Sequence, residues 1–192
     1  MASISTSATA ICRTWASTRE SELAAALPEE AIVIGASFGG LCAAWQLKKR
    51  GVQRVTVLEK RRLGHRSGAG HGRTRLLSLV GFEDPVQGLL KLARDKSWPE
   101  LERDVGRRVV RRIEGLGMGP LSPRFANSAK AGFGQPDDVK AIPLPSARQR
   151  FPQLVLPEGT GTVVDGTAQL IASEVASDAL RALLEREGVR VV

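Results

Sequence analysis

The sequence predicts an α/β fold organised around a dinucleotide-binding unit of strand, tight turn, helix and strand. Residues 31–34 form a short apolar run that is typical of a strand buried on both faces. A glycine-rich turn, residues 35–40, follows, and apolar residues then recur at helical spacing until Gly51, which closes the helix. Residues 54–59 indicate a second buried strand. A helix that begins at such a turn favours an anion at its N-terminus, and a pyrophosphate suits that place.

The glycine spacing follows the dinucleotide-binding frame with one exception. Gly35 and Gly40 stand where the first and third glycines are expected, whereas Ser37 stands at the second. The second glycine normally lets the backbone approach the pyrophosphate. The Cβ of Ser37 takes some of that room, while its hydroxyl can donate to a phosphate oxygen. The alternative interpretation is a glycine-rich turn in an ordinary α/β domain.

An acidic residue ends the second strand at the distance that ribose recognition requires. Glu59 lies about 20 positions after Gly40, as expected for a carboxylate that accepts a hydrogen bond from a ribose hydroxyl. The same carboxylate repels a 2′-phosphate, so the sequence disfavours NADP.

Length and composition indicate a chain that can bury a sizeable core. The chain has 192 residues, 42% of them hydrophobic, which predicts one domain or one and a half. No stretch approaches the roughly 18 apolar residues of a membrane-spanning helix. Its two cysteines, Cys12 and Cys42, give no disulfide framework and suit a reducing compartment. We predict no metal site and no membrane partner.

The formal net charge of +8 raises the question of a nucleic-acid partner. Basic residues gather at 48–50, at 60–62 and at 107–112. Aromatic residues make up only 4% of the chain and tyrosine is absent, so side chains that stack on single-stranded bases are scarce. We therefore favour solvated basic faces beside an anionic cofactor and predict no nucleic-acid partner.

Residues 1–28 differ in composition from the rest of the chain. They are rich in Ser, Thr and Ala, and Arg13 and Arg19 precede the first acidic residue, Glu20. This composition suits a transit peptide for an organelle, a plastid or mitochondrion, and it lacks the apolar segment of a secretory signal. The alternative is a disordered tail on a cytoplasmic protein. In both cases the folded part is expected to start near Glu29.

A second motif follows the ribose acid after a basic, glycine-bearing loop. It is the segment Ser-Gly-Ala-Gly-His-Gly-Arg-Thr-Arg at residues 67–75. Together with the glycine turn and Glu59, this motif resembles the FAD-dependent D-amino acid oxidase superfamily, and most closely its sarcosine oxidase and N-methyl amino acid oxidase branch. Shorter matches continue the resemblance toward the last residue, at 98–102, 114–120, 150–152 and 156–159.

The resemblance implies an FAD-binding Rossmann-type βαβ fold, glutathione-reductase-like, with part of a substrate-domain β-sheet. The implied cofactor is FAD, and the implied partner is a small amine or amino acid, from whose C–N bond the flavin takes a hydride. The residues implied to bind FAD are Gly35, Ala36, Ser37, Phe38, Gly39, Gly40, Glu59, Lys60, Arg61, Gly70, His71, Gly72, Thr74 and Arg75. No catalytic residue is identified, and His71 and Arg75 are the candidates near the flavin. No oligomeric state is predicted.

The apolar spacing and the resemblance together set the expected elements. Three neighbouring parallel strands are expected at 31–34, 55–58 and 189–192. The other expected elements are helices at 39–50, 85–102 and 168–187, a strand at 114–120 and a loop at 123–136.

The expected domains follow from these elements. Residues 29–80 form the βαβ unit and the flavin-contact loop, and residues 81–164 form a partial substrate region. Residues 165–192 supply a helix and the third strand of the FAD-binding sheet.

Two departures from the family pattern bear on function. Where the family often places a second arginine for the substrate carboxylate, this chain has Ser78, which brings no charge and no bidentate donor. The chain also stops at Val192, about halfway through a family member, so most substrate-pocket residues are expected to be missing.

Three interpretations follow from the motifs. The first is the amino-terminal half of a FAD-dependent oxidoreductase that acts on C–N bonds. The second is a truncated FAD-binding fragment that is catalytically incompetent. The third is a NAD-binding Rossmann module, against which the motif at 67–75 argues, because a simple NAD unit has no need of it.

Overall fold

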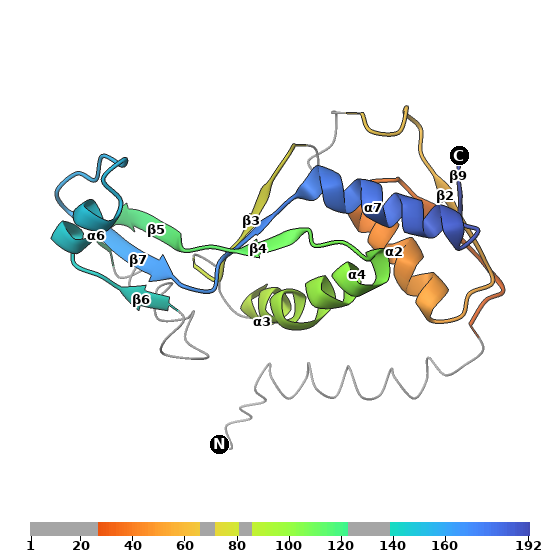
Figure 1. The fold of residues 1–192 in the computed structure, drawn as a ribbon, viewed down its shortest axis with the longest axis horizontal. Helices are drawn as coiled ribbons and strands as arrows, with labels where there is room; N and C mark the ends of the chain where they lie inside the picture. The colour runs from red at the N-terminus through yellow and green to blue at the C-terminus, as the bar shows by residue number, and fades with distance from the viewer. Residues whose placement is uncertain (1–26, 66–71, 81–85, 123–138) are drawn as a thin grey trace, which may run out of the picture. The chain divides into compact units, whose positions relative to one another are not determined.

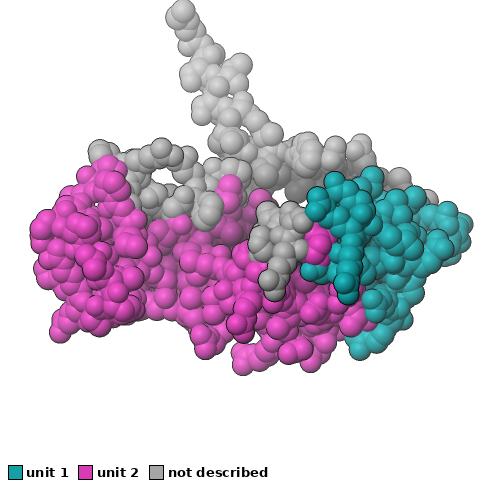
Figure 2. Space-filling view, turned by 90° about the horizontal axis from the view of Figure 1, so that it is seen from above, with its two compact units in different colours: residues 1–64, 184–192 teal, residues 65–183 magenta. Residues whose placement is uncertain are grey.

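The computed structural model describes residues 27–65, 72–80, 86–122 and 139–192 (Figure 1). The chain divides into two compact units, Met1–Gly64 with Leu184–Val192, and His65–Leu183 (Figure 2). Helices and strands are mixed along the chain, which confirms the predicted α/β class. The predicted transit peptide or tail lies, up to residue 26, outside the described residues.

The first unit contains a parallel three-stranded sheet. Its order is β1-β2-β9, with bounds β1 (Glu30–Ile34), β2 (Arg54–Leu58) and β9 (Arg190–Val191). Ala31 pairs with Val55, and Thr56 pairs with Arg190. The prediction of three neighbouring parallel strands is therefore confirmed, with β1 and β9 at the two edges.

One helix follows the glycine turn and covers a face of this sheet. This helix is α2 (Phe38–Lys49), whose bounds are close to the predicted span of 39–50, and it contacts β1 and β2. Its Ala44 and Trp45 are buried, as are Val55 and Val57 of β2. The helix ends before Gly51, whose φ of +96° is a conformation that favours glycine.

The opposite face of the sheet is open in the described part of this unit. Ile32 is 67% exposed, Ile34 87% and Leu58 40%. These side chains share a face because Ile34 pairs with Leu58 and residues two apart in a strand point the same way. The expectation that residues 31–34 are buried on both faces is therefore wrong here, since α2 covers only the face that carries Val55 and Val57.

The second unit contains two three-stranded antiparallel sheets. The first has the order β3-β8-β4, with bounds β3 (Arg75–Leu77), β8 (Gln169–Ile171) and β4 (Val110–Arg112). The second has the order β5-β7-β6, with bounds β5 (Gly115–Pro120), β7 (Thr160–Asp165) and β6 (Val139–Ala141). β5 confirms the strand predicted at 114–120. The loop predicted at 123–136 lies outside the described residues.

Helices complete the second unit. α3 (Val86–Leu92), the π-helical segment η1 (Ala93–Ser97) and α4 (Trp98–Val105) follow one another without a break. They confirm the helix predicted at 85–102 for the residues described there. α6 (Leu144–Arg150) precedes β7, and α7 (Ser173–Arg186) leads towards β9. Among the described residues, no helix has both the length and the apolar content that a membrane span needs.

The buried cluster of the second unit lies at the β5-β7-β6 sheet. Its members are Leu79, Val139 and Val163, with Val80 and Leu90 packed against them. A glycine in β5 makes room for this packing, because a Cβ on Gly117 would lie 2.4 Å from Cγ1 of Val80.

The helix predicted at 168–187 is wrong in its first turn. Gln169–Ile171 forms strand β8, and α7 begins only at Ser173. β8 pairs on both sides, since Ile171 lies opposite Arg75 of β3 and opposite Val110 of β4. These partners are distant in sequence, and their backbone hydrogen bonds override the helical spacing of the apolar residues.

Candidate functional site

The glycine turn brings α2 very close to the end of β1. Gly35 has a φ of +98°, and its N–H donates to the carbonyl oxygen of Leu58 at 2.7 Å. A Cβ on Gly40 would lie 1.9 Å from the carbonyl oxygen of Gly35, a separation that real side chains do not show. Both positions therefore require glycine, the first for its backbone conformation and the second for close helix–strand approach.

Ser37 caps the helix and leaves its own hydroxyl hydrogen for another partner. Its Oγ accepts a hydrogen bond from the N–H of Gly40 at 3.5 Å, and its carbonyl oxygen accepts from the N–H of Leu41 at 2.9 Å. Because Oγ acts as an acceptor in the cap, the hydroxyl can donate to a bound anion. The first turn of α2 contains no acidic residue, so no carboxylate of that turn competes for the helix N-terminus.

The structure places the predicted ribose acid beside the glycine turn. Oε2 of Glu59 accepts a hydrogen bond from the N–H of Ala36 at 2.9 Å, and Oε1 accepts from the N–H of Arg61 at 3.0 Å. Each carboxylate oxygen can accept more than one hydrogen bond, which is the property that recognition of a ribose hydroxyl needs. The end of β2 is therefore fixed to the turn, and the two parts of the predicted site are brought together.

These residues fit a dinucleotide such as FAD. The turn offers backbone N–H groups at a helix N-terminus, close approach at Gly40, and a fixed carboxylate at Glu59. Phe38 and Gly39 lie in the first turn of α2, and Lys60 is exposed directly after Glu59.

The second predicted motif lies in the other unit. Gly72 has a φ of +114°, and its carbonyl oxygen accepts a hydrogen bond from Oγ of Ser173 at 2.6 Å, which attaches the segment to the start of α7. Nη1 of Arg75 donates to the carbonyl oxygen of Thr74 at 2.8 Å, and both side chains are exposed. Gly70 and His71 lie outside the described residues.

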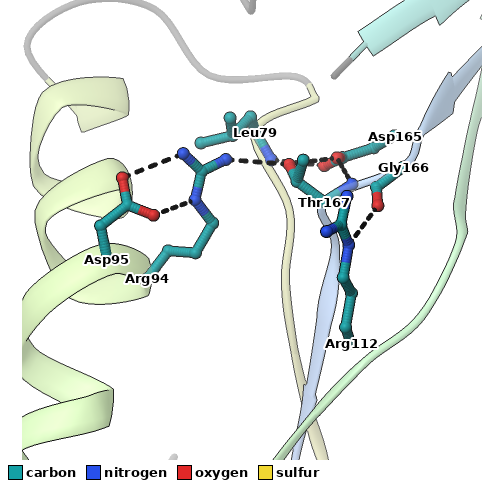
Figure 3. Close-up of polar contacts among 7 residues, drawn as sticks. All are labelled: Leu79, Arg94, Asp95, Arg112, Asp165, Gly166 and Thr167. Carbon is teal, nitrogen blue, oxygen red and sulfur yellow. Dashed lines mark hydrogen bonds and ion pairs between the residues drawn. The ribbon is translucent and has the colours of Figure 1, made fainter. Parts of the chain in front are cut away.

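A buried carboxylate that the sequence analysis did not single out organises the second unit (Figure 3). Asp165 is fully buried, and its Oδ2 accepts hydrogen bonds from Oγ of Ser78 at 2.8 Å and from the N–H of Leu79 at 2.9 Å. Its Oδ1 accepts from the N–H and from Oγ1 of Thr167, both at 2.8 Å. The signal available in the sequence was Asp-Gly-Thr, since aspartate readily accepts from the backbone two residues on.

An arginine extends this network. Nη1 of Arg94 donates to Oγ1 of Thr167 at 2.9 Å, while its Nε and Nη2 donate to the two carboxylate oxygens of Asp95 at 2.7 Å and 3.0 Å (Figure 3). The hydrogen bond from Arg94 holds the pKa of Asp95 below its ordinary value. Ser78, at the position where the resemblance leads one to expect an arginine, belongs to the same network through its hydrogen bond to Asp165.

Cys42 lies in the first turns of α2, and burial raises the pKa of its thiol from 9.0 to about 11. The thiol should therefore be protonated and unreactive at neutral pH, because the thiolate is the nucleophile. In a Cys12→Ser background, we expect alkylation by iodoacetamide at pH 8 to be roughly 100-fold slower in the native chain than in urea, as a two-unit difference requires.

The folded-state pKa of Cys42 lies above the unfolded value, which also fixes the pH dependence of stability. The contribution of the protonated Cys42 thiol to the free energy of unfolding is fully present below about pH 9 and is lost as the pH rises through about 11. Equal alkylation rates in native and denatured chains at pH 8 would show that the thiol is not buried.

Within the described residues, no group of three or more His, Cys, Asp or Glu side chains is arranged to hold a metal ion.

Known proteins are similar in sequence to most of this chain. A monomeric sarcosine oxidase from Arthrobacter sp. (strain TE1826) is 26% identical over 165 residues, which are 85% of this chain and 42% of that protein. The peroxisomal sarcosine oxidase of Homo sapiens is 28% identical over 170 residues, 85% of this chain and 43% of that protein. The chain therefore spans less than half the length of these two relatives.

Solved structures show the same fold. NikD, described as an unusual amino acid oxidase essential for nikkomycin biosynthesis, matches with a TM-score of 0.71 and 22% identity, over 85% of this chain and 42% of that one. L-proline dehydrogenase from P. horikoshii matches with a TM-score of 0.65 and 23% identity, over 86% and 44%. The profile of the family described as FAD dependent oxidoreductase (DAO) matches residues 30–192. The chain belongs to this family of FAD-dependent oxidoreductases.

Proposed function

We propose that this chain forms the FAD-binding, amino-terminal part of an oxidoreductase that acts on the C–N bond of a small amine or amino acid. Its family supports this function, as does its similarity to two sarcosine oxidases over 85% of its length. The observation that carries the proposal is the hydrogen bond from the N–H of Ala36 to Oε2 of Glu59, which joins the phosphate turn to the ribose acid.

The residues of this chain would hold and orient the cofactor. Bound flavin supplies the electron-accepting chemistry, and the protein supplies binding and orientation. The hydroxyl of Ser37 and the N–H groups of the first turn of α2 would donate to the pyrophosphate. Glu59 would accept from a ribose hydroxyl, and Lys60 and Arg61 would line the same edge.

The motif at 67–75 would contact the rest of the flavin. Gly72 is fixed by Ser173, and the guanidinium of Arg75 is held against its own backbone by the carbonyl of Thr74. A guanidinium oriented in this way loses less conformational entropy when it binds an anionic or polar group of the cofactor. We assign the same role to Gly70 and His71 from their place in the motif.

Loss of the ribose acid should weaken FAD binding. Glu59→Ala removes a charged hydrogen-bond acceptor, so we expect FAD binding to become weaker by about 1–3 kcal/mol. The measurement is a titration of the purified chain with FAD, followed by flavin fluorescence. Glu187→Ala is the matched control, because it removes the same charge from an exposed position at the end of α7.

Two outcomes of this titration would count against the site. Equal FAD affinity in the Glu59 variant and the Glu187 control would exclude Glu59 as a cofactor ligand. Tighter binding of NAD than of FAD would favour a NAD-binding module instead.

A specific observation also favours the second interpretation, a FAD-binding chain that is catalytically incompetent by itself. The sheet face with Ile32, Ile34 and Leu58 is open in the described residues, so one side of the sheet beside the turn lacks apolar cover. Anaerobic addition of sarcosine, N-methyl amino acids or pipecolate to the FAD-loaded chain distinguishes the two interpretations. Bleaching of the flavin band shows a working enzyme, and an unchanged band with FAD bound shows a binding fragment.

A further inference from the structure

A hollow in the second unit gathers several arginine side chains. It lies over β4 and β8 and has a volume of about 410 Å³. The lining residues that matter here are Thr74, Arg108, Arg111, Arg112, Leu170 and Ala172. The hollow contains no residue of the glycine turn and does not include Glu59, so it is a different place from the pyrophosphate and ribose site proposed above.

The strand register explains why apolar side chains, here called the floor of the hollow, lie beside an arginine. Leu170 of β8 pairs with Arg111 of β4 on one side and with Leu76 of β3 on the other. Directly paired residues of antiparallel strands share a face, so these three side chains form one row across the sheet. Ala172 follows Leu170 by two positions and continues the apolar floor.

The arginines of this hollow are largely uncompensated. Neither Arg108 nor Arg111 makes a hydrogen bond or an ion pair with any residue in the described part of the chain, and both are exposed. Nε of Arg112 donates to the carbonyl oxygen of Gly166 at 2.8 Å, which holds its guanidinium beside Gly166 (Figure 3). Because Arg112 follows Arg111 directly in β4, its side chain points to the opposite face, and the anion is assigned to Arg108 and Arg111 alone. Cations gathered around one hollow repel one another, and a bound anion relieves that repulsion.

Glu102, the acidic residue next to the start of β4, forms no ion pair with Arg108 or Arg111. Oε1 of Glu102 accepts hydrogen bonds from the backbone N–H groups of Val109 and Val110, at 2.7 Å and 2.8 Å. It is held there by the start of β4, and Glu102 does not line the hollow.

We propose that this hollow binds an organic anion, with its carboxylate on Arg108 and Arg111 and its apolar body on Leu170 and Ala172. The planar guanidinium donates two parallel hydrogen bonds to a carboxylate, which suits these side chains to that group. The hydroxyl of Thr74 adds a further donor at the rim. The apolar floor selects an anion with a hydrocarbon or aromatic part over a small inorganic one.

The test compares probes that differ only in charge or only in the apolar part. The 192-residue chain is titrated by calorimetry with phenylacetate, phenylacetamide and inorganic phosphate. No FAD is added, because Thr74 also belongs to the flavin-contact motif. We expect phenylacetate to bind at least about tenfold more tightly than the neutral amide or phosphate, as loss of a charged hydrogen bond implies. Phenylacetate binding should weaken as salt is raised, because the arginines are exposed.

Single arginine substitutions complete the test. Arg108→Gln and Arg111→Gln should each weaken phenylacetate binding about tenfold. Arg107→Gln removes the same charge from an exposed neighbour outside the lining and should leave binding unchanged. Circular dichroism should show all three variants folded, since these side chains are exposed. Equal binding of acid and amide, or an equal effect of all three substitutions, would overturn the proposal.

Discussion

Gly40→Ala is expected to destabilise the chain by about 3 kcal/mol and to abolish FAD binding. An alanine Cβ would lie 1.9 Å from the carbonyl oxygen of Gly35 and 3.0 Å from its carbonyl carbon. Both are backbone atoms, so no side-chain rotation relieves the contact. Gly35 is also held by the hydrogen bond from its N–H to Leu58 at 2.7 Å, so relief of the clash distorts the ends of β1 and β2. Urea unfolding measures the loss of stability, and flavin fluorescence measures binding.

Gly39→Ala is the matched control, one residue earlier in the same turn of α2. Its Cβ would meet only Oγ of Ser37, at an ordinary 3.9 Å. Glycine to alanine in an unstrained helix stabilises by about 0.5–1 kcal/mol, so this variant should be at least as stable as the parent chain. If the two variants unfold at the same urea concentration, the close approach of α2 to β1 is not the reason for Gly40.

Short-range patterns made the first unit predictable. The turn from Gly35 to Gly40 needs backbone conformations and distances that only glycine allows, so its residues appear directly in the sequence. Glu59 follows from its position at the end of β2, and the structure places its carboxylate on the N–H of Ala36. The three parallel strands were found for the same reason, because each is a short apolar run next to a turn or a helix end.

Long-range pairing accounts for what the sequence analysis missed. Gln169–Ile171 has apolar residues that suit a helix, and only its partners in β3 and β4 make it a strand. The open face at Ile32 and Ile34 was also missed, because the residues that cover a strand are distant from it in the sequence. An apolar run predicts burial, but it does not say which residues provide the cover.

Asp165 was missed as well, as was strand β7, which ends at this residue. Four of its hydrogen bonds come from groups at residues 78, 79 and 167, and two of these donors lie more than 80 positions away in the sequence. Only the local part, the turn to Thr167, leaves a mark in the sequence. A buried polar hub of this kind is therefore found from the fold and not from spacing.

Asp165→Ala is expected to destabilise the chain by about 3–5 kcal/mol. The carboxylate is fully buried, and its loss leaves the N–H groups of Leu79 and Thr167 without their acceptor. Arg94 also loses its indirect link to a negative charge, because it reaches Asp165 only through Oγ1 of Thr167. The measurement is the free energy of unfolding in urea, with circular dichroism as the signal.

Asp165→Asn and Asp178→Ala separate the role of the buried acceptor from a general loss of charge. The amide keeps one carbonyl oxygen but turns its NH2 group toward either Leu79 N–H or Thr167 N–H, so Asp165→Asn should be intermediate in stability. Asp178 lies on α7 with 69% of its side chain exposed and pairs with Arg181 at 3.0 Å. Exposed pairs of this kind contribute little, so Asp178→Ala should stay within about 0.5 kcal/mol of the parent. Equal stability of Asp165→Ala and Asp178→Ala would mean that the hydrogen bonds to Asp165 do not hold β3, β7 and β8 together.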